Sequence, residues 1–174
     1  TVETLPIFFP RWSFKNRNYG MLYEIFFIPT RNGIIYNFPF SDSIYLYNER
    51  LQTTRTFKIP SKYIPESANP IYTPAVAYSQ KDYIKHKSES LQYLDVNTWE
   101  EKEIFLRFQT PPLENDNTHY TFYLSIFNEK MEVLHEMVMK NNESVRSFIA
   151  NNCLWIFNRS QNEEKLEFTK LCYH

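Results

Sequence analysis

The stretch Ile44-Tyr45-Leu46-Tyr47-Asn48-Glu49-Arg50-Leu51 has a close copy further along the chain, Leu124-Ser125-Ile126-Phe127-Asn128-Glu129-Lys130-Met131. In both, an apolar run ends at Asn, two charged residues follow, and a large aliphatic residue begins a second run. This pattern predicts a strand, a tight turn and a returning strand, because Asn accepts the backbone angles of tight turns. The repeat therefore predicts a body built of antiparallel hairpins.

The composition favours an all-β fold in a single domain covering residues 1–174. The chain has 15 Phe and 13 Tyr, and aromatic side chains fit the half-buried surface of a sheet. The net charge of −1, without a basic stripe, argues against a nucleic-acid partner. No apolar run is long enough to cross a bilayer. The first residues carry no targeting signal.

Eleven short apolar runs, separated by turn residues, predict three groups of strands. The first group occupies 21–59 and contains Asn32-Gly33, a strong hairpin signal. The second occupies 90–139, and the third, 145–174, lacks an outer strand. The expected strands are Met21–Ile28, Gly33–Phe40, Ile44–Tyr47, Gln52–Ile59, Leu91–Val96, Ile104–Gln109, Tyr120–Phe127, Glu132–Met139, Val145–Ala150, Cys153–Phe157 and Leu166–Tyr173.

Two segments interrupt this rhythm. Residues 60–89 contain four prolines, which cannot donate to a sheet ladder, so we expect a long insertion with one short strand near Ala75–Ser79. Glu129–Lys140 is rich in helix-forming residues, and a helix is the alternative there. The match to the Asn48 hairpin favours a strand.

Four-stranded antiparallel meanders are the unit of a propeller blade, so we expect about three blades of a partial β-propeller. A β-sandwich is the alternative, since it also has many short strands. Three blades alone would leave open edges. We therefore expect the missing blades to come from a second chain or from a lost N-terminal half.

Five segments carry a family resemblance: Gly33–Asn48, Ile59-Pro60-Ser61-Lys62-Tyr63, Leu106-Arg107-Phe108, Ile126–Met131, and Phe148-Ile149-Ala150 through Trp155 to Phe168. They resemble a family of six-bladed, TolB-like β-propellers, a domain-of-unknown-function group of predicted lipoproteins in Bacteroides-type bacteria, which implies membrane contact only through a lipid anchor outside this chain. The likeness spans most of Met21–Tyr173 and is that of the family's C-terminal half, but the pattern departs between Lys81 and Asn97. The resemblance implies an extracytoplasmic protein attached to the cell envelope, and it carries over no catalytic residue.

The residues offer no catalytic or metal-binding signature. His86, His119, His135 and His174 lack the spacing of a helical metal pair. No Ser stands in a nucleophile motif, and the two glycines form no phosphate-binding loop. We therefore expect neither a metal nor a cofactor.

Cys153 and Cys172 face each other if the last hairpin centres between Asn162 and Glu163. The same register pairs Leu154 with Leu171 and Phe157 with Phe168. A cross-strand disulfide is then conceivable. A slip of one residue would place the sulfurs on opposite faces, so the preferred interpretation is two buried thiols.

Aromatic and Arg residues in loops are the candidates for a binding surface, because Trp, Tyr and Arg are enriched at recognition sites. These are Arg11, Trp12, Tyr63, Tyr72 and Arg107. We expect a binding or scaffolding module with a protein or glycan ligand, without catalysis of its own. The alternative is a glycan-acting lyase or hydrolase with its site in a central funnel, where polar side chains of several innermost strands would converge.

Overall fold

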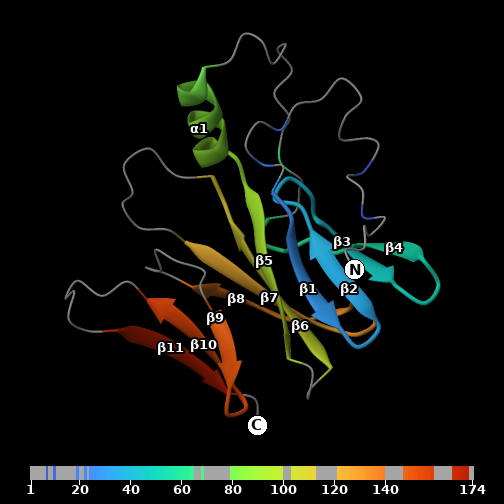
Figure 1. Ribbon diagram of the computed structural model, residues 1–174. Helices are drawn as coiled ribbons and strands as arrows, with labels where there is room; N and C mark the ends of the chain where they lie inside the picture. The colour runs from blue at the N-terminus through green and yellow to red at the C-terminus, as the bar shows by residue number, and fades with distance from the viewer. Residues whose placement is uncertain are drawn as a thin grey trace.

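The computed structural model describes residues 7, 10, 19, 22, 24–64, 68, 79–99, 103–112, 121–139, 147–158 and 166–172. Within these ranges the protein consists of antiparallel sheets and one helix, and none of the described sheets closes into a barrel (Figure 1). The prediction of an all-β fold is confirmed at this level. No helix among the described residues has the length and hydropathy needed to cross a membrane.

Sheet 1 is a four-stranded meander in the order β1-β2-β3-β4. Its strands are β1 (Phe26–Thr30), β2 (Gly33–Asn37), β3 (Ser43–Asn48) and β4 (Thr53–Lys58). Gly33 opens β2 with φ +135°, and a Cβ there would lie 1.8 Å from the carbonyl oxygen of Tyr47 on the neighbouring strand. Only glycine fits this close approach of two backbones.

Sheet 2 repeats the meander in the order β5-β6-β7-β8. The strands are β5 (Gln92–Trp99), β6 (Ile104–Thr110), β7 (Phe122–Asn128) and β8 (Val133–Met139). The helical alternative for 129–140 is therefore wrong over the described residues. The pairing of β5 with β6 shifts between Tyr93 and Val96, inside the segment where the family pattern departs.

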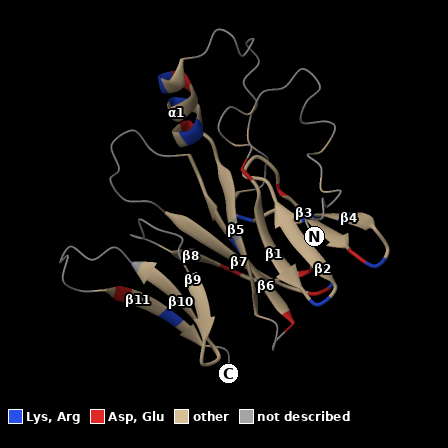
Figure 2. Cartoon of the chain, viewed as in Figure 1, with Lys and Arg blue, Asp and Glu red and all other residues tan. Residues whose placement is uncertain are grey.

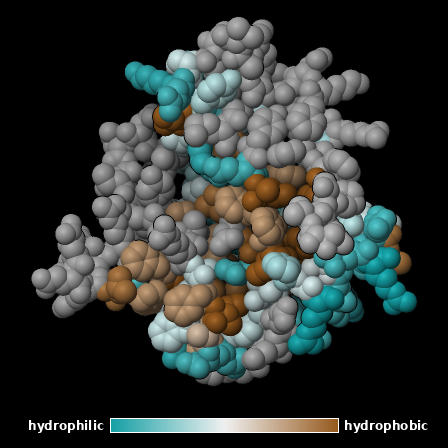
Figure 3. Space-filling view, in the orientation of Figure 1, coloured by the Kyte–Doolittle hydropathy of each residue, from teal (hydrophilic) through white to brown (hydrophobic). Residues whose placement is uncertain are grey.

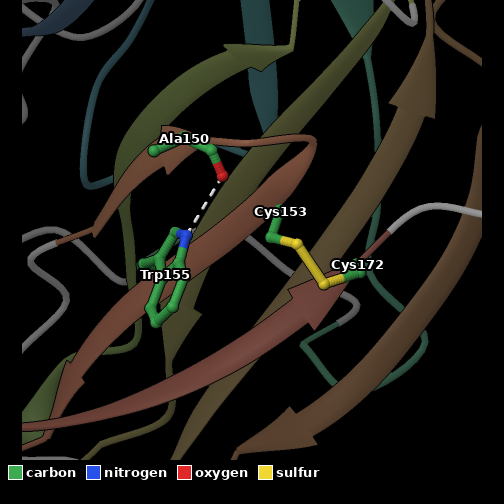
Figure 4. Close-up of a disulfide and its surroundings, with 4 residues drawn as sticks. All are labelled: Ala150, Cys153, Trp155 and Cys172. Carbon is green, nitrogen blue, oxygen red and sulfur yellow. Dashed lines mark hydrogen bonds between the residues drawn. A yellow bond between two sulfur atoms is a disulfide. The ribbon is translucent and has the colours of Figure 1, made fainter.

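Sheet 3 has the order β11-β10-β9, from β9 (Ser147–Ala150), β10 (Cys153–Asn158) and β11 (Glu167–Cys172). Its hairpin register pairs Cys153 with Cys172 and Phe157 with Phe168, as the sequence predicted. The two cysteines form a disulfide across β10 and β11 (Figure 4). The preferred interpretation of free thiols is wrong, because the register places both sulfurs on the same face.

The insertion contains a helix, α1 (Gln80–Glu89), which the sequence analysis did not predict. Ser79 caps it: its hydroxyl accepts a hydrogen bond from the Asp82 backbone N–H, and the Asp82 carboxylate accepts one from the Ser79 N–H. This capping box satisfies two free donors of the first turn. Of the short strand expected at 75–79, residues 75–78 lie outside the described residues.

The three sheets pack against one another through alternating apolar positions. Ile35 and Ile44 of sheet 1 pack with Val96 and Phe127 of sheet 2. A second cluster joins sheet 2 to sheet 3 and comprises Leu106, Phe108, Leu124, Leu154 and Ile156, among others. A third covers the opposite face of sheet 1, where Tyr36 and Tyr45 are buried. Such stacking is compatible with a sandwich as well as with a propeller.

Candidate functional site

A groove of about 350 Å³ lies between sheets 1 and 2 at the end where their hairpins turn. Its apolar wall is made by Ile35 and Leu46 from sheet 1 and by Phe105 and Met131 from sheet 2. Because a binding groove combines apolar surface with a few polar groups, we take this groove as the candidate site.

Four charged side chains line the same groove. Arg31 and Arg55 belong to sheet 1, whereas Glu103 and Glu129 stand in the two hairpin turns of sheet 2. All four are exposed, and Figure 2 shows acidic and basic positions along these turns at the lower right of the view. The groove therefore offers both cationic and anionic partners to a ligand.

The repeated Asn residues shape the hairpin turns that border the groove, and we call these turns the rim. The side-chain oxygen of Asn48 accepts a hydrogen bond of 2.9 Å from the Leu51 N–H. The equivalent oxygen of Asn128 accepts bonds of 3.0 Å from the N–H groups of Lys130 and Glu132. In both hairpins the Asn side chain takes the place of a backbone acceptor. The sequence repeat thus marks the residues that carry the rim.

Further along β6 than the groove residue Phe105, Arg107 is fully buried, so its assignment to a binding surface is wrong. Its guanidinium donates hydrogen bonds to the carbonyl oxygens of Asp42 and Ile59, at the end of sheet 1. It also lies 4.4 Å from the ring centroid of Tyr93. Burial lowers the pKa of Arg107 to about 10, which leaves it charged at neutral pH.

Glu136 of β8 continues this polar layer. Its carboxylate accepts hydrogen bonds of 2.9 Å from the Lys62 backbone N–H and 2.7 Å from the Ser125 hydroxyl. Burial opposes ionisation, but these hydrogen bonds outweigh it and lower the pKa of Glu136. The carboxylate is thus held ionised by the segment that leaves β4. Arg107 and Glu136 fasten sheet 1 to sheet 2, and we call their contacts the polar seam.

The remaining candidates from the sequence do not assemble into one site. Tyr63 is half-exposed, stacks on Tyr123 with ring centroids 4.6 Å apart, and has the Lys62 ammonium 4.8 Å from its ring. Arg11, Trp12 and Tyr72 lie outside the described residues. The groove residues were missed because nothing local separates Arg31, Arg55 and Phe105 from the other Arg and aromatic residues of the chain, although Glu129 in the charged pair after Asn128 was already visible.

The described residues hold no cluster of His, Cys, Asp and Glu suited to a metal ion. Ser125 does contact a carboxylate, but its hydroxyl donates to Glu136, which is itself ionised and held by other donors. Such a carboxylate is hydrogen-bonded for structure rather than poised as a general base. What the described geometry offers chemically is binding.

Comparison with known proteins supplies the family. No curated protein matches the chain. A solved structure from Bacteroides vulgatus, described as a member of the DUF4221 family, is similar in fold with a TM-score of 0.70 and 17% sequence identity. The similarity covers 86% of this chain but only 44% of that one, so the chain spans less than half of its relative's length. Residues 2–138 match the family described as "Domain of unknown function (DUF4221)". The chain therefore belongs to the DUF4221 family.

Proposed function

We propose that this chain forms three blades of a β-propeller that binds a ligand at the cell envelope. The proposal of a propeller is supported by the first strands of the three sheets. β1 lies against β5, and the Asn97 side chain of β5 donates a hydrogen bond of 2.8 Å to Ser147 of β9. In a propeller the first strands of successive blades meet around the axis, whereas a sandwich has no such convergence.

The outer strands support the same arrangement. β4 is exposed at almost every position, and β11 alternates between exposed and half-buried positions. A gradient from contacting first strands to exposed last strands is expected of blades that point outward from an axis. The other blades would come from the remainder of a longer chain, since the relative is about twice as long.

The observation that carries the binding function is the groove between sheets 1 and 2. A neutral sugar offers no charged group to its two arginines and two glutamates, whereas a peptide segment carries both charges and an apolar side chain for Phe105 and Met131. The ligand class we propose is therefore a short stretch of polypeptide. No described feature favours catalysis.

The proposed location is extracytoplasmic, with attachment to the envelope through a lipid anchor outside these residues. The Cys153–Cys172 disulfide supports an oxidising compartment, because disulfides are rare in the reducing cytosol. The Bacteroides relative supports the bacterial setting.

Binding is tested by titrating ¹⁵N-labelled protein with two panels, mixed-charge peptides and neutral oligosaccharides, and following amide shifts by NMR. We expect peptides to shift the amides of Phe105 and Met131, and Arg55→Glu with Glu129→Lys to weaken binding at least tenfold. The matched control is Lys85→Glu with Glu89→Lys, which exchanges the charges of an exposed pair in α1, outside the groove. Shifts confined to other regions, or equal effects of both double variants, would overturn the proposal.

A further inference from the structure

Sheet 3 has a second apolar face that points away from sheet 2. In the observed register Phe148 of β9 lies beside Trp155 of β10, and Phe157 of β10 lies beside Phe168 of β11. We call these four residues the aromatic face. Leu154 and Ile156 point to the opposite side and are buried against sheet 2. Sheet 3 is therefore apolar on both sides, as expected of a sheet packed between two layers.

Two of the four residues of the aromatic face are exposed, and Trp155 and Phe157 are partly buried. Phe148 is 48% exposed and Phe168 is 38% exposed. Figure 3 shows hydrophobic side chains uncovered over this sheet, at the lower left of the view. Clustered exposed aromatic side chains of this kind mark an interaction surface.

The orientation of the rings indicates what kind of partner fits. The ring of Phe148 lies beside Trp155, and the planes of the two rings are nearly parallel. The Lys170 ammonium lies 5.0 Å from the centre of the same indole. In the register Phe148 and Lys170 lie on opposite sides of Trp155, so the indole has a neighbour on each side. Its N–H already donates to the Ala150 carbonyl oxygen (Figure 4). A sugar that stacked on Trp155 would therefore have to displace one of these neighbours.

Aromatic rings that stand edge-on to one another can interdigitate with the side chains of another sheet. Phe168 meets both Phe148 and Trp155 edge-on, so the face is ridged. Sheet 1 packs on sheet 2 and sheet 2 on sheet 3 through such alternating side chains. A further sheet on the aromatic face would continue this series.

We infer that the aromatic face is the docking surface for a further antiparallel sheet, supplied by the remainder of a longer DUF4221 chain. The inference rests on the propeller proposed above. More than half of the Bacteroides relative lies outside the region that this chain covers, so the family's longer chain has the length to supply such a sheet. The occupant that we propose is this sheet, and a glycan or a second copy of the chain would be a different outcome of the test.

The test compares the 174-residue chain with the full product of its gene by carbene labelling and peptide mass spectrometry. In the full product we expect labelling of Phe148 and Phe168 to fall at least fivefold. Leu134 of β8, which is 54% exposed, is the matched control and should keep its labelling. Unchanged labelling of the aromatic face in the full product would overturn the inference, as would a gene that encodes no further sheet.

A substitution separates docking from a general effect on folding. Phe148→Lys removes the contacts with Trp155 and Phe168 and should lower the thermal midpoint of the 174-residue chain by no more than about 4 °C, because the residue is already half-exposed there, whereas it should lower that of the full product by at least twice as much. Leu134→Lys should change neither. Protection that requires added oligosaccharide, or dimerisation of the 174-residue chain that Phe148→Lys abolishes, would show a different occupant. Labelling and thermal midpoints do not involve the groove. The docking inference can therefore fail while peptide binding to the groove holds, and peptide binding can fail while the docking inference holds.

Discussion

Replacing Arg107 with Met tests whether the polar seam stabilises the contact between sheets 1 and 2. The substitution removes the hydrogen bonds to the carbonyl oxygens of Asp42 and Ile59 and the contact with the Tyr93 ring. The Asp42 carbonyl oxygen keeps a hydrogen bond from the Ile59 N–H, so losing the Arg107 bond there costs only about 1 kcal/mol of stability. Losing the bond to the Ile59 carbonyl oxygen costs about 2 kcal/mol. The ring contact adds about 1 kcal/mol.

A buried guanidinium also carries a desolvation cost, and removing it offsets part of this loss. That relief is limited here, because the charge of Arg107 interacts favourably with the side chains of Asp42 and Glu136, and the substitution removes this attraction. We therefore expect Arg107→Met to lower the free energy of unfolding by about 3 kcal/mol. For a domain with a typical stability of about 5–15 kcal/mol, this is a large fraction.

The assay is urea denaturation at pH 7, followed by both circular dichroism and Trp fluorescence, with the slope of the transition compared between variants. Arg55→Met, at an exposed position of sheet 1, is the matched control and should change the free energy by less than about 0.5 kcal/mol. If Arg107→Met were as stable as the parent or more so, desolvation would outweigh the hydrogen bonds. The seam would then not be a source of stability.

Three further predictions concern the rest of the chain. The lowered pKa of Glu136 contributes stability that is present above its unfolded pKa of about 4.5 and lost as pH falls through the folded value; Glu136→Gln should flatten the acid limb of urea midpoints measured between pH 7 and 3. Replacing both Cys153 and Cys172 with Ser, which opens a link between residues 19 apart in sequence, should lower the free energy of unfolding by about 3 kcal/mol in urea, and dithiothreitol should then have no further effect on it. Gly33→Ala should lower the free energy of unfolding by at least about 2 kcal/mol, because its methyl group overlaps the Tyr47 carbonyl; a smaller loss would show that the two strands can separate.

Local patterns predicted the strands and turns because they depend on neighbouring residues. Asn151 and Asn152 do adopt positive φ, at 51° and 59°, as expected of a tight turn. The pairing of Cys153 with Cys172 follows from counting outward from one hairpin. The helix α1 was missed because it buries no residue among those described and therefore carries no apolar stripe. Its signals were the capping box and the basic residues His86 and Lys87 in the last turn.

The groove and the polar seam could not be predicted in the same way. The alternation of side chains along a strand places Arg107 and Leu106 on opposite faces of the sheet, but it does not reveal which of the two faces another sheet covers. The rim residues Arg31, Glu103 and Glu129 come from turns far apart in the sequence, and they converge only because sheets 1 and 2 stack with their hairpins at the same end. Sheet stacking depends on side chains from distant segments, which no local pattern records.

The meander topology has a consequence for synthesis on the ribosome. Every strand of the described sheets pairs only with strands adjacent in sequence, so sheet 1 is complete at Lys58 and sheet 2 at Met139. A nascent chain can form the hydrogen bonds of sheet 1 before sheet 2 has been translated. Arg107 then makes its contacts of the polar seam with a sheet that has already folded. A polypeptide stopped after Met139 would accordingly keep two intact ladders and expose Leu106 and Phe108, the side chains that sheet 3 normally covers.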